Sequence, residues 1–494
     1  MPCRRAHLLH PGIHTMSKSD AEPQVDHVHA QPKPAQPARY HSMDQFRGFI
    51  ILMMYLVHTH LFHVRVFENT KWHAQFGDMI MPGFIFAVGF SFRLSILRRY
   101  PQAGAFRTGA SYLRRSVLLI LIVMMMEGFG NVASWSEMNE LPRSYVDETV
   151  AESNDVGMDR GRQFGERFGR NNQENVAEEA EGAEEGPLLP EHFWLHYWHW
   201  FLGTIVHHHI CEVLAIIAVT QLIILPLILT SVRTRLIAMG LFTIAHLLLT
   251  GWFNWDYLNG RPNAFDDFLN FRPRGGYDGG LFGDLNWAVV MLAGSLSYDM
   301  LIALQASWKT VGKFIGIGVA LMFAGYLLMF PGRLYYLNAE SAEGQMNQQE
   351  AFLQHPVWPP MSEVGSRSFS EWFPPIPVLQ ADSDEDIVVN NYWKASKYVV
   401  SMPYVIFSVG FCFALYGLFV AMSDVLGLKI GVFRTFGSNA LIAYALHFFI
   451  WDQIEGMGPR NAPDWFAYVQ FGIFFAIMYL IVFSLERRKL FVRL

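Results

Sequence analysis

The chain has 494 residues, of which 52% are hydrophobic and 16% are charged, and its formal net charge is −6. An ordinary soluble domain carries about 25% charged residues, so this composition argues against a soluble enzyme. It also argues against nucleic acid as a partner, because the chain has no basic domain and no zinc-finger or helix-turn-helix pattern. Cys3, Cys211 and Cys412 are too few for a disulfide framework.

The apolar runs predict an all-α, polytopic membrane protein with about ten transmembrane helices. A helix needs about 20 residues to cross a bilayer. The runs lie at 46–65, 77–97, 113–131, 209–230, 235–253, 282–304, 312–330, 399–422, 434–452 and 464–485. Residues 43–494 would form one transmembrane domain. Residues 1–42 are polar and rich in His, Pro and Gln, so we expect a disordered cytoplasmic tail.

Basic residues orient these spans, because cytoplasmic loops are enriched in Lys and Arg. Clusters of Lys or Arg fall at both termini and at every even-numbered connection. We therefore predict that both termini are cytoplasmic and that the long connections at 132–208 and 331–398 are extracytoplasmic insertions. The first insertion includes an acidic tract between Glu174 and Glu185. We expect a multi-pass protein of a bacterial inner membrane.

On this topology, every histidine beyond the tail falls in the outer half, and Trp308 is the one tryptophan on the cytoplasmic side. Aromatic belts normally occupy both interfaces. Because aromatic faces stack on sugar rings, an outer surface that binds glycans is one explanation. The other is that the long outer loops carry most of the aromatic residues.

Ionisable groups at the predicted outer ends of the spans suggest a pocket. Such groups are costly in hydrocarbon and are often functional. The carboxylates are Asp78, Glu127, Glu212 and Asp284, and the nearest histidines are His58, His73 and His209. A buried carboxylate beside an imidazole orients the ring and raises its basicity, as a general base requires. Each group could also be a helix-terminal residue that reaches water.

The same histidines leave a metal or haem site open as an alternative. His58, His60 and His63 are closely spaced, and His207, His208 and His209 precede Glu212. Neither set has the full spacing of a known metal site, and consecutive histidines point around a helix rather than together. A transporter is the other alternative. We find neither the repeated halves nor the paired broken helices that transporters show.

Several segments resemble known families. Asp44-Gln45-Phe46-Arg47-Gly48 before an apolar span looks like the opening of the transmembrane acyltransferase superfamily. Trp72-His73-Ala74 and residues 78–89 resemble the heparan-α-glucosaminide N-acetyltransferase family. Its pattern is a His-Ala in the first outer loop, then Asp-Leu-Val-Phe-Pro before a Phe-rich span. Residues 278–283 and 436–444 also look similar to that family.

The resemblance implies an enzyme that moves an acetyl group from cytosolic acetyl-CoA to an amino sugar across the membrane. The family's catalytic histidine maps to His73. Its catalytic asparagine maps to His58, so this chain differs from the family at that position. His58 also lies eleven residues after Arg47, where the broader superfamily places its own histidine. A second departure is that His73 and Asp78 are only five residues apart. The catalytic candidates are therefore His73, His58 and Asp78. The candidates for substrate binding are Asp44, Arg47, Glu127, Glu212 and Asn439.

Acyl transfer from a thioester needs a base or a nucleophile and a donor for the developing oxyanion. An imidazole can fill either of the first two roles. Acetyl-CoA or another acyl-CoA is the expected co-substrate, and no metal is expected. Arginines at the predicted cytoplasmic mouth could hold the CoA phosphates, or they could simply be positive-inside residues. These are Arg93, Arg98, Arg99, Arg114 and Arg115. The expected partners are membrane lipid and a glycan or lipid-linked sugar, with a homodimer as one option.

Overall fold

The structure is a computed structural model that describes most of the predicted transmembrane domain. The described residues are 40–59, 74–128, 194, 198, 201–203, 205–207, 209–269, 271, 275–335, 355–365, 368–378, 390–458 and 463–491. Residues 1–39 of the predicted tail, the acidic tract and His73 lie outside them, as does much of each predicted insertion, whereas His41 and Ser42 of the predicted tail belong to a helix.

The described elements are helical, which confirms the all-α prediction for this part of the chain. The extended pairing found there is a single β-bridge between Asn259 and Gly275. The α-helices are α1 His41–His58, α2 Ile80–Gly128, α6 Val213–Ile224, α7 Val232–Leu249, α8 Trp255–Leu258, α9 Ala264–Leu269, α10 Gly283–Leu304, α11 Trp308–Leu327, α14 Met402–Phe419, α15 Gly431–Ser438, α16 Ala440–Glu455 and α17 Asp464–Arg487. Short 3-10 turns are η2 Gly77–Met79, η5 His209–Cys211, η7 Gly280–Phe282, η8 Phe330–Tyr335, η9 Met361–Gly365 and η10 Phe369–Trp372. Two π-helical turns are η6 Thr250–Asn254 and η11 Val420–Val425.

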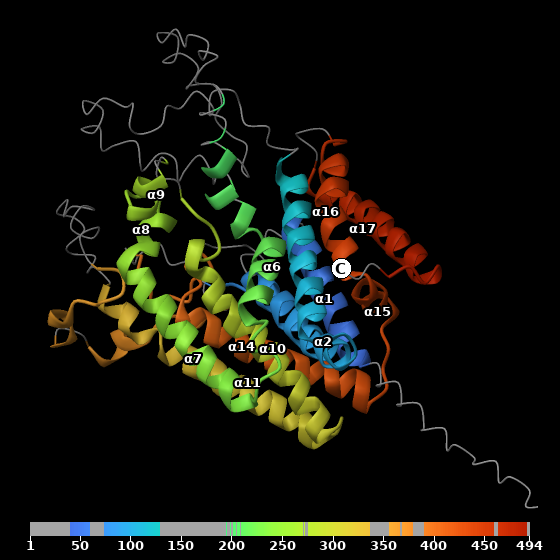
Figure 1. The fold of residues 1–494 in the computed structure, drawn as a ribbon, viewed down its shortest axis with the longest axis horizontal. Coiled ribbons are helices and arrows are strands. Elements are labelled where there is room, and N and C mark those ends of the chain that lie inside the picture. The colour runs from blue at the N-terminus through green and yellow to red at the C-terminus, as the bar shows by residue number, and fades with distance from the viewer. Residues whose placement is uncertain are drawn as a thin grey trace, which may run out of the picture. The chain divides into compact units, whose positions relative to one another are not determined.

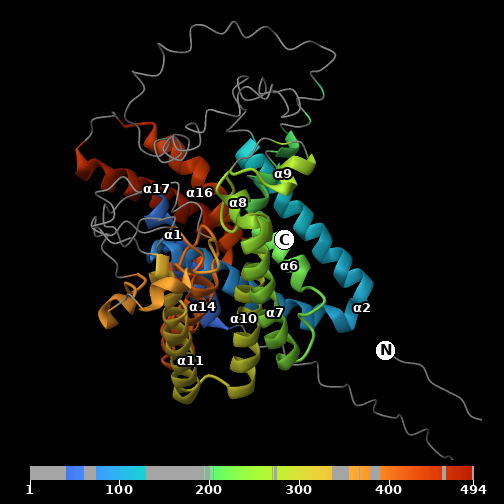
Figure 2. The same ribbon diagram turned by 90° about the vertical axis from the view of Figure 1, so that its left-hand side faces the viewer.

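Six helical segments within the described ranges are long and apolar enough to cross a membrane, and a bent pair at 201–224 would make a seventh. One of the six contains α2, which has 49 residues. At 1.5 Å per residue, a straight helix of that length would span about 74 Å, more than twice the roughly 30 Å hydrocarbon core. Gly104 has a left-handed φ of 73° and divides α2 into two arms, and Figure 2 shows the ribbon changing direction. The ten-span count and the orientation stay predictions.

Two helices differ in their bounds from the predicted spans. Helix α1 begins at His41, five residues before the predicted span, because polar side chains of its first turn bond to a distant segment described below. The predicted span 434–452 is two helices, α15 and α16, which meet at Asn439 with φ −132°. That φ lies outside the α region, so the backbone turns at this residue.

Helix α1 packs beside α2 and against α15 and α16, so the start of the chain's helical part meets its end (Figure 1). Glycine permits the closest of these approaches. A Cβ on Gly48 would lie 1.8 Å from the Phe433 carbonyl oxygen, and one on Gly437 would lie 1.8 Å from that of Asp44. Such contacts between small residues are typical of helices that pack in a membrane.

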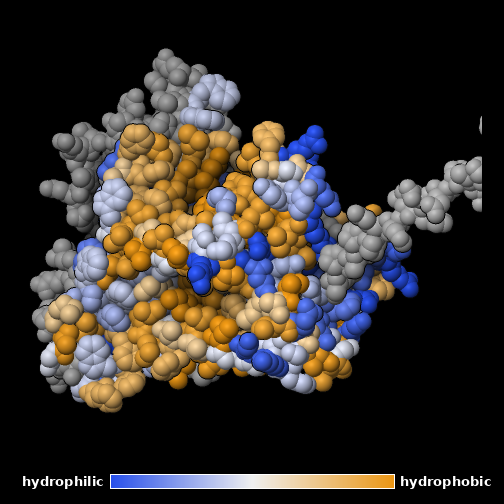
Figure 3. Space-filling model, turned by 60° about the horizontal axis from the view of Figure 1, so that its bottom comes forward, coloured by the Kyte–Doolittle hydropathy of each residue, from blue (hydrophilic) through white to orange (hydrophobic). Residues whose placement is uncertain are grey.

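The outward faces of several helices are apolar, as a lipid-facing surface requires. Helix α17 is largely unburied, and α7 and α11 expose large hydrophobic side chains such as Ile237, Leu241 and Phe323. Figure 3 shows a face on which hydrophobic atoms predominate. Soluble monomers rarely expose apolar patches of this extent. The chain is therefore a multi-pass integral membrane protein.

Candidate functional site

A pair of histidines joins the last turn of α1 to the middle of α16. His58 Nδ1 lies 2.8 Å from His447 Nε2, and the two rings stack with centroids 5.0 Å apart. His447 is 1% exposed and His58 is half-buried. The pair joins residues 389 positions apart in the chain. The sequence named His58 as a candidate and counted His447 among the outer histidines, but it gave no reason to pair them.

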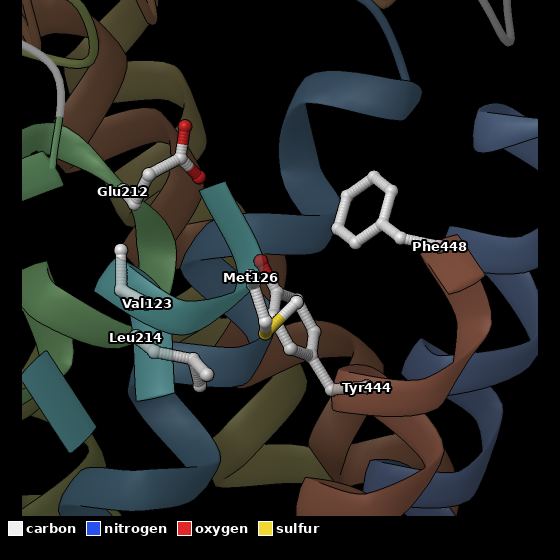
Figure 4. A pocket seen from close by; sticks show the side chains of 6 residues that line it. All are labelled: Val123, Met126, Glu212, Leu214, Tyr444 and Phe448. Atoms are coloured by element: carbon white, nitrogen blue, oxygen red, sulfur yellow. The ribbon is translucent and has the colours of Figure 1, made fainter. Parts of the chain in front are cut away.

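A small pocket opens next to this pair (Figure 4). Its walls come from the second arm of α2, from the start of α6 and from α16. The lining side chains are Val123, Met126, Glu212, Leu214, Tyr444 and Phe448. Phe448 is also the ring on which His58 stacks, with centroids 5.3 Å apart. The pocket thus combines an apolar wall with one carboxylate and adjoins two imidazoles.

The enclosed part of this pocket measures only about 10 Å³, roughly the room that one water molecule needs. Sites for drug-sized ligands are far larger, roughly 300 to 1,000 Å³, so an acyl group or a sugar could enter only if the lining side chains moved apart. Neither His58 nor Asp78 is among the lining side chains that the structure describes. The predicted cavity shared by His58, His73 and Asp78 therefore stays a prediction.

Asp78 is buried in the turn before α2 and supports the local backbone. Its Oδ2 accepts a hydrogen bond from the backbone N–H of Gln75 at 2.9 Å, and its backbone carbonyl accepts one from the Tyr404 hydroxyl at 2.6 Å. The Asp78 carboxylate is close enough to Lys397 to affect its pKa. Burial alone would lower the pKa of Lys397, but the carboxylates of Asp278 and Asp78 raise it. Lys397 could not be singled out from the sequence, because nothing local links it to Asp78, which lies 319 positions earlier.

His73 lies outside the described residues, but Ala74, which follows it in the chain, is held firmly. The backbone N–H of Ala74 donates to the Ala395 carbonyl at 2.8 Å, and its carbonyl accepts from the Val378 N–H at 2.7 Å. The first predicted outer loop thus ends on the segment that carries Lys397. Two parts of the chain that the sequence assigned to different outer connections meet here.

The other predicted carboxylates are dispersed. Glu212 lines the pocket, whereas the Asp284 carboxylate accepts a hydrogen bond from the Thr220 hydroxyl at 3.1 Å. Glu127 lies in the last turn of α2, and its side chain is outside the described part. His209 is buried in the turn before α6.

The opposite end of α1 holds the family-like motif in a polar network. The Ser42 hydroxyl donates to Asp424 Oδ2 at 2.5 Å, and the side chain of Gln45 donates to the Leu428 carbonyl at 2.9 Å. Asp44 and Arg47 pair with each other at 2.5 Å. Asn439, at the turn between α15 and α16, is buried. Ser42 and Gln45 thus join α1 to the C-terminal part of the chain, whereas the Asp44–Arg47 pair lies within α1. A role for Asp44, Arg47 or Asn439 in substrate binding stays a prediction.

The candidate CoA-binding arginines fall into two groups. Arg93 is tied into the helix bundle, because its Nε donates to Asp299 at 3.0 Å and the same carboxylate pairs with the fully buried Arg235. The others lie at or near the surface. Arg99 donates to the Ser111 hydroxyl at 3.0 Å, Arg98 and Arg114 are exposed, and Arg115 is half-buried.

The metal alternative finds no support in the described ranges, where no three His, Cys, Asp or Glu side chains gather as ligands. His207, from the predicted histidine run, pairs instead with Asp266 at 2.9 Å, and both side chains are fully buried. A carboxylate that orients a buried imidazole in this way is a common structural arrangement.

Comparison with known proteins agrees with the resemblance. Residues 39–135 match the family model described as heparan-alpha-glucosaminide N-acetyltransferase, catalytic. The match covers α1, the first predicted outer loop and α2, and so it includes His58, His73 and Asp78. No curated protein matches the chain. The resemblance read from the sequence is confirmed over the matched residues, which indicate membrane-bound acetyltransferase chemistry rather than metal handling or transport.

Proposed function

We propose, from the acetyltransferase match at residues 39–135, that this chain transfers an acetyl group from acetyl-CoA to a sugar on the other side of the membrane. The observation that carries the proposal is the His58–His447 pair beside a small pocket that contains a carboxylate. His58 lies inside the matched segment. A half-buried imidazole near a carboxylate offers the base that acyl transfer needs.

In the proposed reaction, His58 acts as a general base. The acceptor's amine nitrogen attacks the thioester carbonyl carbon and gives its proton to the imidazole. The new C–N bond forms, the C–S bond breaks, and the imidazolium returns the proton to the departing CoA sulfur. Glu212 would orient the acceptor at the pocket. His73, the position of the family's catalytic histidine, would be a second base or would carry the acyl group.

We further propose that CoA approaches from the side of the molecule on which the two arms of α2 meet, at Gly104. Arg98, Arg99 and Arg114 lie around that junction and are mostly exposed, and the guanidinium group suits bidentate contact with phosphate. The pocket has no room for the whole cofactor, so at most the acyl end would enter it, once the lining side chains move apart. Arg115 is half-buried nearby and would contribute less.

The test uses the full chain, purified in lipid nanodiscs, with acetyl-CoA and two acceptors. One is a glucosaminide with a free amine, and the matched control is its N-acetylated form, which offers hydroxyl groups alone. We expect release of free CoA thiol with the amine. Release with both sugars would instead indicate O-acetylation, and release with neither would overturn the proposed activity for amino sugars.

The arginine proposal has its own control. Arg98→Ala combined with Arg114→Ala should raise KM for acetyl-CoA several-fold and leave KM for the sugar unchanged. Arg488→Ala changes an exposed arginine at the end of α17 and should change neither value. An equal effect of both changes on KM for acetyl-CoA would mean that overall charge, and not a local site, attracts CoA.

A further inference from the structure

His447 is held in one orientation by its own helix. Its Nδ1 lies against the backbone carbonyl oxygen of Tyr444, one turn earlier in α16. A carbonyl oxygen accepts hydrogen bonds and cannot donate them, so Nδ1 of His447 must carry a hydrogen. The side chain is 1% exposed, and water has little access to exchange this contact for another.

The groups around the His447 ring favour its neutral form. The ring lies 5.9 Å from that of Tyr55, 5.4 Å from that of Tyr444 and 3.9 Å from that of Phe448, measured between centroids. These neighbours carry no charge at neutral pH, and burying an imidazolium among them would be costly. A neutral imidazole has one N–H, which the Tyr444 carbonyl already uses. Nε2 of His447 is therefore a hydrogen-bond acceptor.

This assignment determines the tautomer of His58. Its Nδ1 lies 2.8 Å from Nε2 of His447, and that nitrogen can only accept. Nδ1 of His58 must then donate, so the neutral ring keeps its lone pair on Nε2. We infer that His447 is a positioning residue that holds His58 in the tautomer with a hydrogen on Nδ1 and leaves Nε2 of His58 as the basic nitrogen.

Ring stacking keeps this chain of hydrogen bonds in place. His58 stacks on both His447 and Phe448. The neighbouring Tyr55 is fixed in turn, because its hydroxyl donates to the Ala443 carbonyl at 3.0 Å. Neither imidazole can rotate freely without breaking these contacts. The orientation of His58 therefore depends on residues of α16, far from the segment that matches the acetyltransferase family.

The consequence for catalysis rests on the proposed function. When Nε2 of His58 takes the acceptor's proton, the ring becomes a cation and its Nδ1–H becomes a stronger donor to His447. His447 thus stabilises the imidazolium as it forms. The arrangement resembles that of serine hydrolases, where a carboxylate holds the catalytic imidazole in the correct tautomer. Here a neutral imidazole backed by a backbone carbonyl takes that position.

The first test measures the tautomer without any assay of activity. Nitrogen-15 NMR of the full chain labelled at histidine ring nitrogens distinguishes nitrogens that carry a hydrogen from those with a lone pair. The spectrum of His58→Asn, in which one ring is missing, assigns the signals of His58. We expect a hydrogen on Nδ1 and a lone pair on Nε2. The opposite pattern in the unaltered chain would overturn the inference, whether or not the protein transfers acetyl groups.

The second test uses two amide replacements that differ in reach. The side-chain amide of His447→Gln extends to the place of Nε2 and can accept from His58. That of His447→Asn ends near the place of Nδ1, so it can donate to the Tyr444 carbonyl but cannot reach His58. We expect His447→Gln to keep the His58 tautomer and to keep kcat within about tenfold. His447→Asn should release the tautomer and lower kcat on the order of a hundredfold or more, with little change in KM for acetyl-CoA.

A merely structural role for His447 predicts a different result, because both replacements would then lower the amount of folded protein equally and leave the tautomer unchanged. That result would overturn the inference. If the unaltered chain and the His447 variants all fail to transfer acetyl groups, the proposed function fails. The NMR result still decides the tautomer of His58.

Discussion

The two ends of α1 differ in how they meet the C-terminal helices. At the Ser42 end, polar side chains bond to η11 and to the backbone that follows it, and each bond satisfies a group that would otherwise be buried alone. At the His58 end, aromatic rings stack beside a small pocket, and the main polar contact joins two imidazoles. One end is suited to stability and the other to chemistry.

This difference separates the residues that resemble the family from the residues that would perform its reaction. The motif at 44–48 is a recognisable feature of the sequence, yet its residues have structural contacts. Gln45 bonds to Ser423 and Leu428, Asp44 pairs with Arg47 within α1, and Gly48 allows the close approach of α15. The imidazole pair, by contrast, includes a residue outside the matched segment. A sequence motif can therefore mark a fold while the chemistry depends on distant residues.

The largest expected effect is at the His58 end. His58→Asn removes the base but keeps a polar group of similar size, so acetyl transfer should fall on the order of a hundredfold or more while the folded fraction stays near normal. His73→Ala should abolish transfer if His73 carries the acyl group. Steady-state release of CoA thiol measures both.

The outcome also ranks the two histidines. Near-normal activity in His58→Asn together with loss in His73→Ala would make His58 a positioning group and His73 the base. The reverse pattern would move the chemistry to His58 alone. Full activity in both variants would mean that the site lies elsewhere in the chain.

The second effect is at the Ser42 end and concerns stability. Gln45 is 1% exposed; its side-chain nitrogen donates to the Ser423 hydroxyl and the Leu428 carbonyl, and its oxygen accepts from the Ile430 N–H at 2.7 Å. Gln45→Leu leaves buried groups unpaired, at about 1–3 kcal/mol for each. We expect a clear loss of thermal stability, measured by size-exclusion of heated samples, but normal kcat for the protein that remains folded.

Gln102→Leu is the matched control, because Gln102 is exposed in α2 and the same change should leave stability unaltered there. A Gln45→Leu protein that is stable but inactive would contradict the contrast between the two ends of α1.

Much of the fold follows from the sequence, because apolar runs of span length leave few alternatives to helix in a membrane. Each of the ten predicted ranges contains helix in the structure. The residue at which α1 begins could not be predicted from the sequence. That helix begins early because Ser42 and Gln45 bond to residues more than 370 positions later, and no local pattern carries such information.

The candidate site was predictable to a similar extent. His58 could be singled out as an ionisable group inside a span, and Glu212 as a carboxylate near a span end. The pairing of His58 with His447, and the effect of Asp78 on Lys397, depend on how α1, α16 and the 390–401 segment pack together. A single sequence does not show how these segments pack against one another.

A third prediction concerns pH and the segment on which Ala74 rests. Burial lowers the pKa of Lys394 to about 7, and its ammonium donates to Asn390 Oδ1 at 3.1 Å. In the unfolded chain this amine keeps its proton up to about pH 10.4. Between these values the unfolded state binds more protons, so stability should rise with pH, by at most about 1.4 kcal/mol per pH unit. Below about pH 7 the amine is protonated in both states, so this group no longer makes stability depend on pH.

Lys394→Met removes the titrating group and should flatten that rise, measured as thermal stability between pH 7 and pH 10. Lys309→Met, at the start of α11, serves as the control, because Lys309 is exposed. An unchanged slope in Lys394→Met would show that another group is responsible.

The smallest effect should come from the ion pair of the motif itself. Arg47 and Asp44 lie one helical turn apart, with 29% of the Arg47 side chain and 10% of the Asp44 side chain exposed. Water reaches the Arg47 end of this pair and screens it in part, so we expect a contribution near the upper end of the roughly 0.2–1 kcal/mol found for exposed pairs. Arg47→Gln should therefore lower thermal stability slightly and leave acetyl transfer nearly normal. A double-mutant cycle with Asp44→Asn isolates the pair from its surroundings. A large loss of kcat in Arg47→Gln at unchanged stability would instead assign this end of α1 a part in substrate binding, and the contrast between the two ends of the helix would no longer hold.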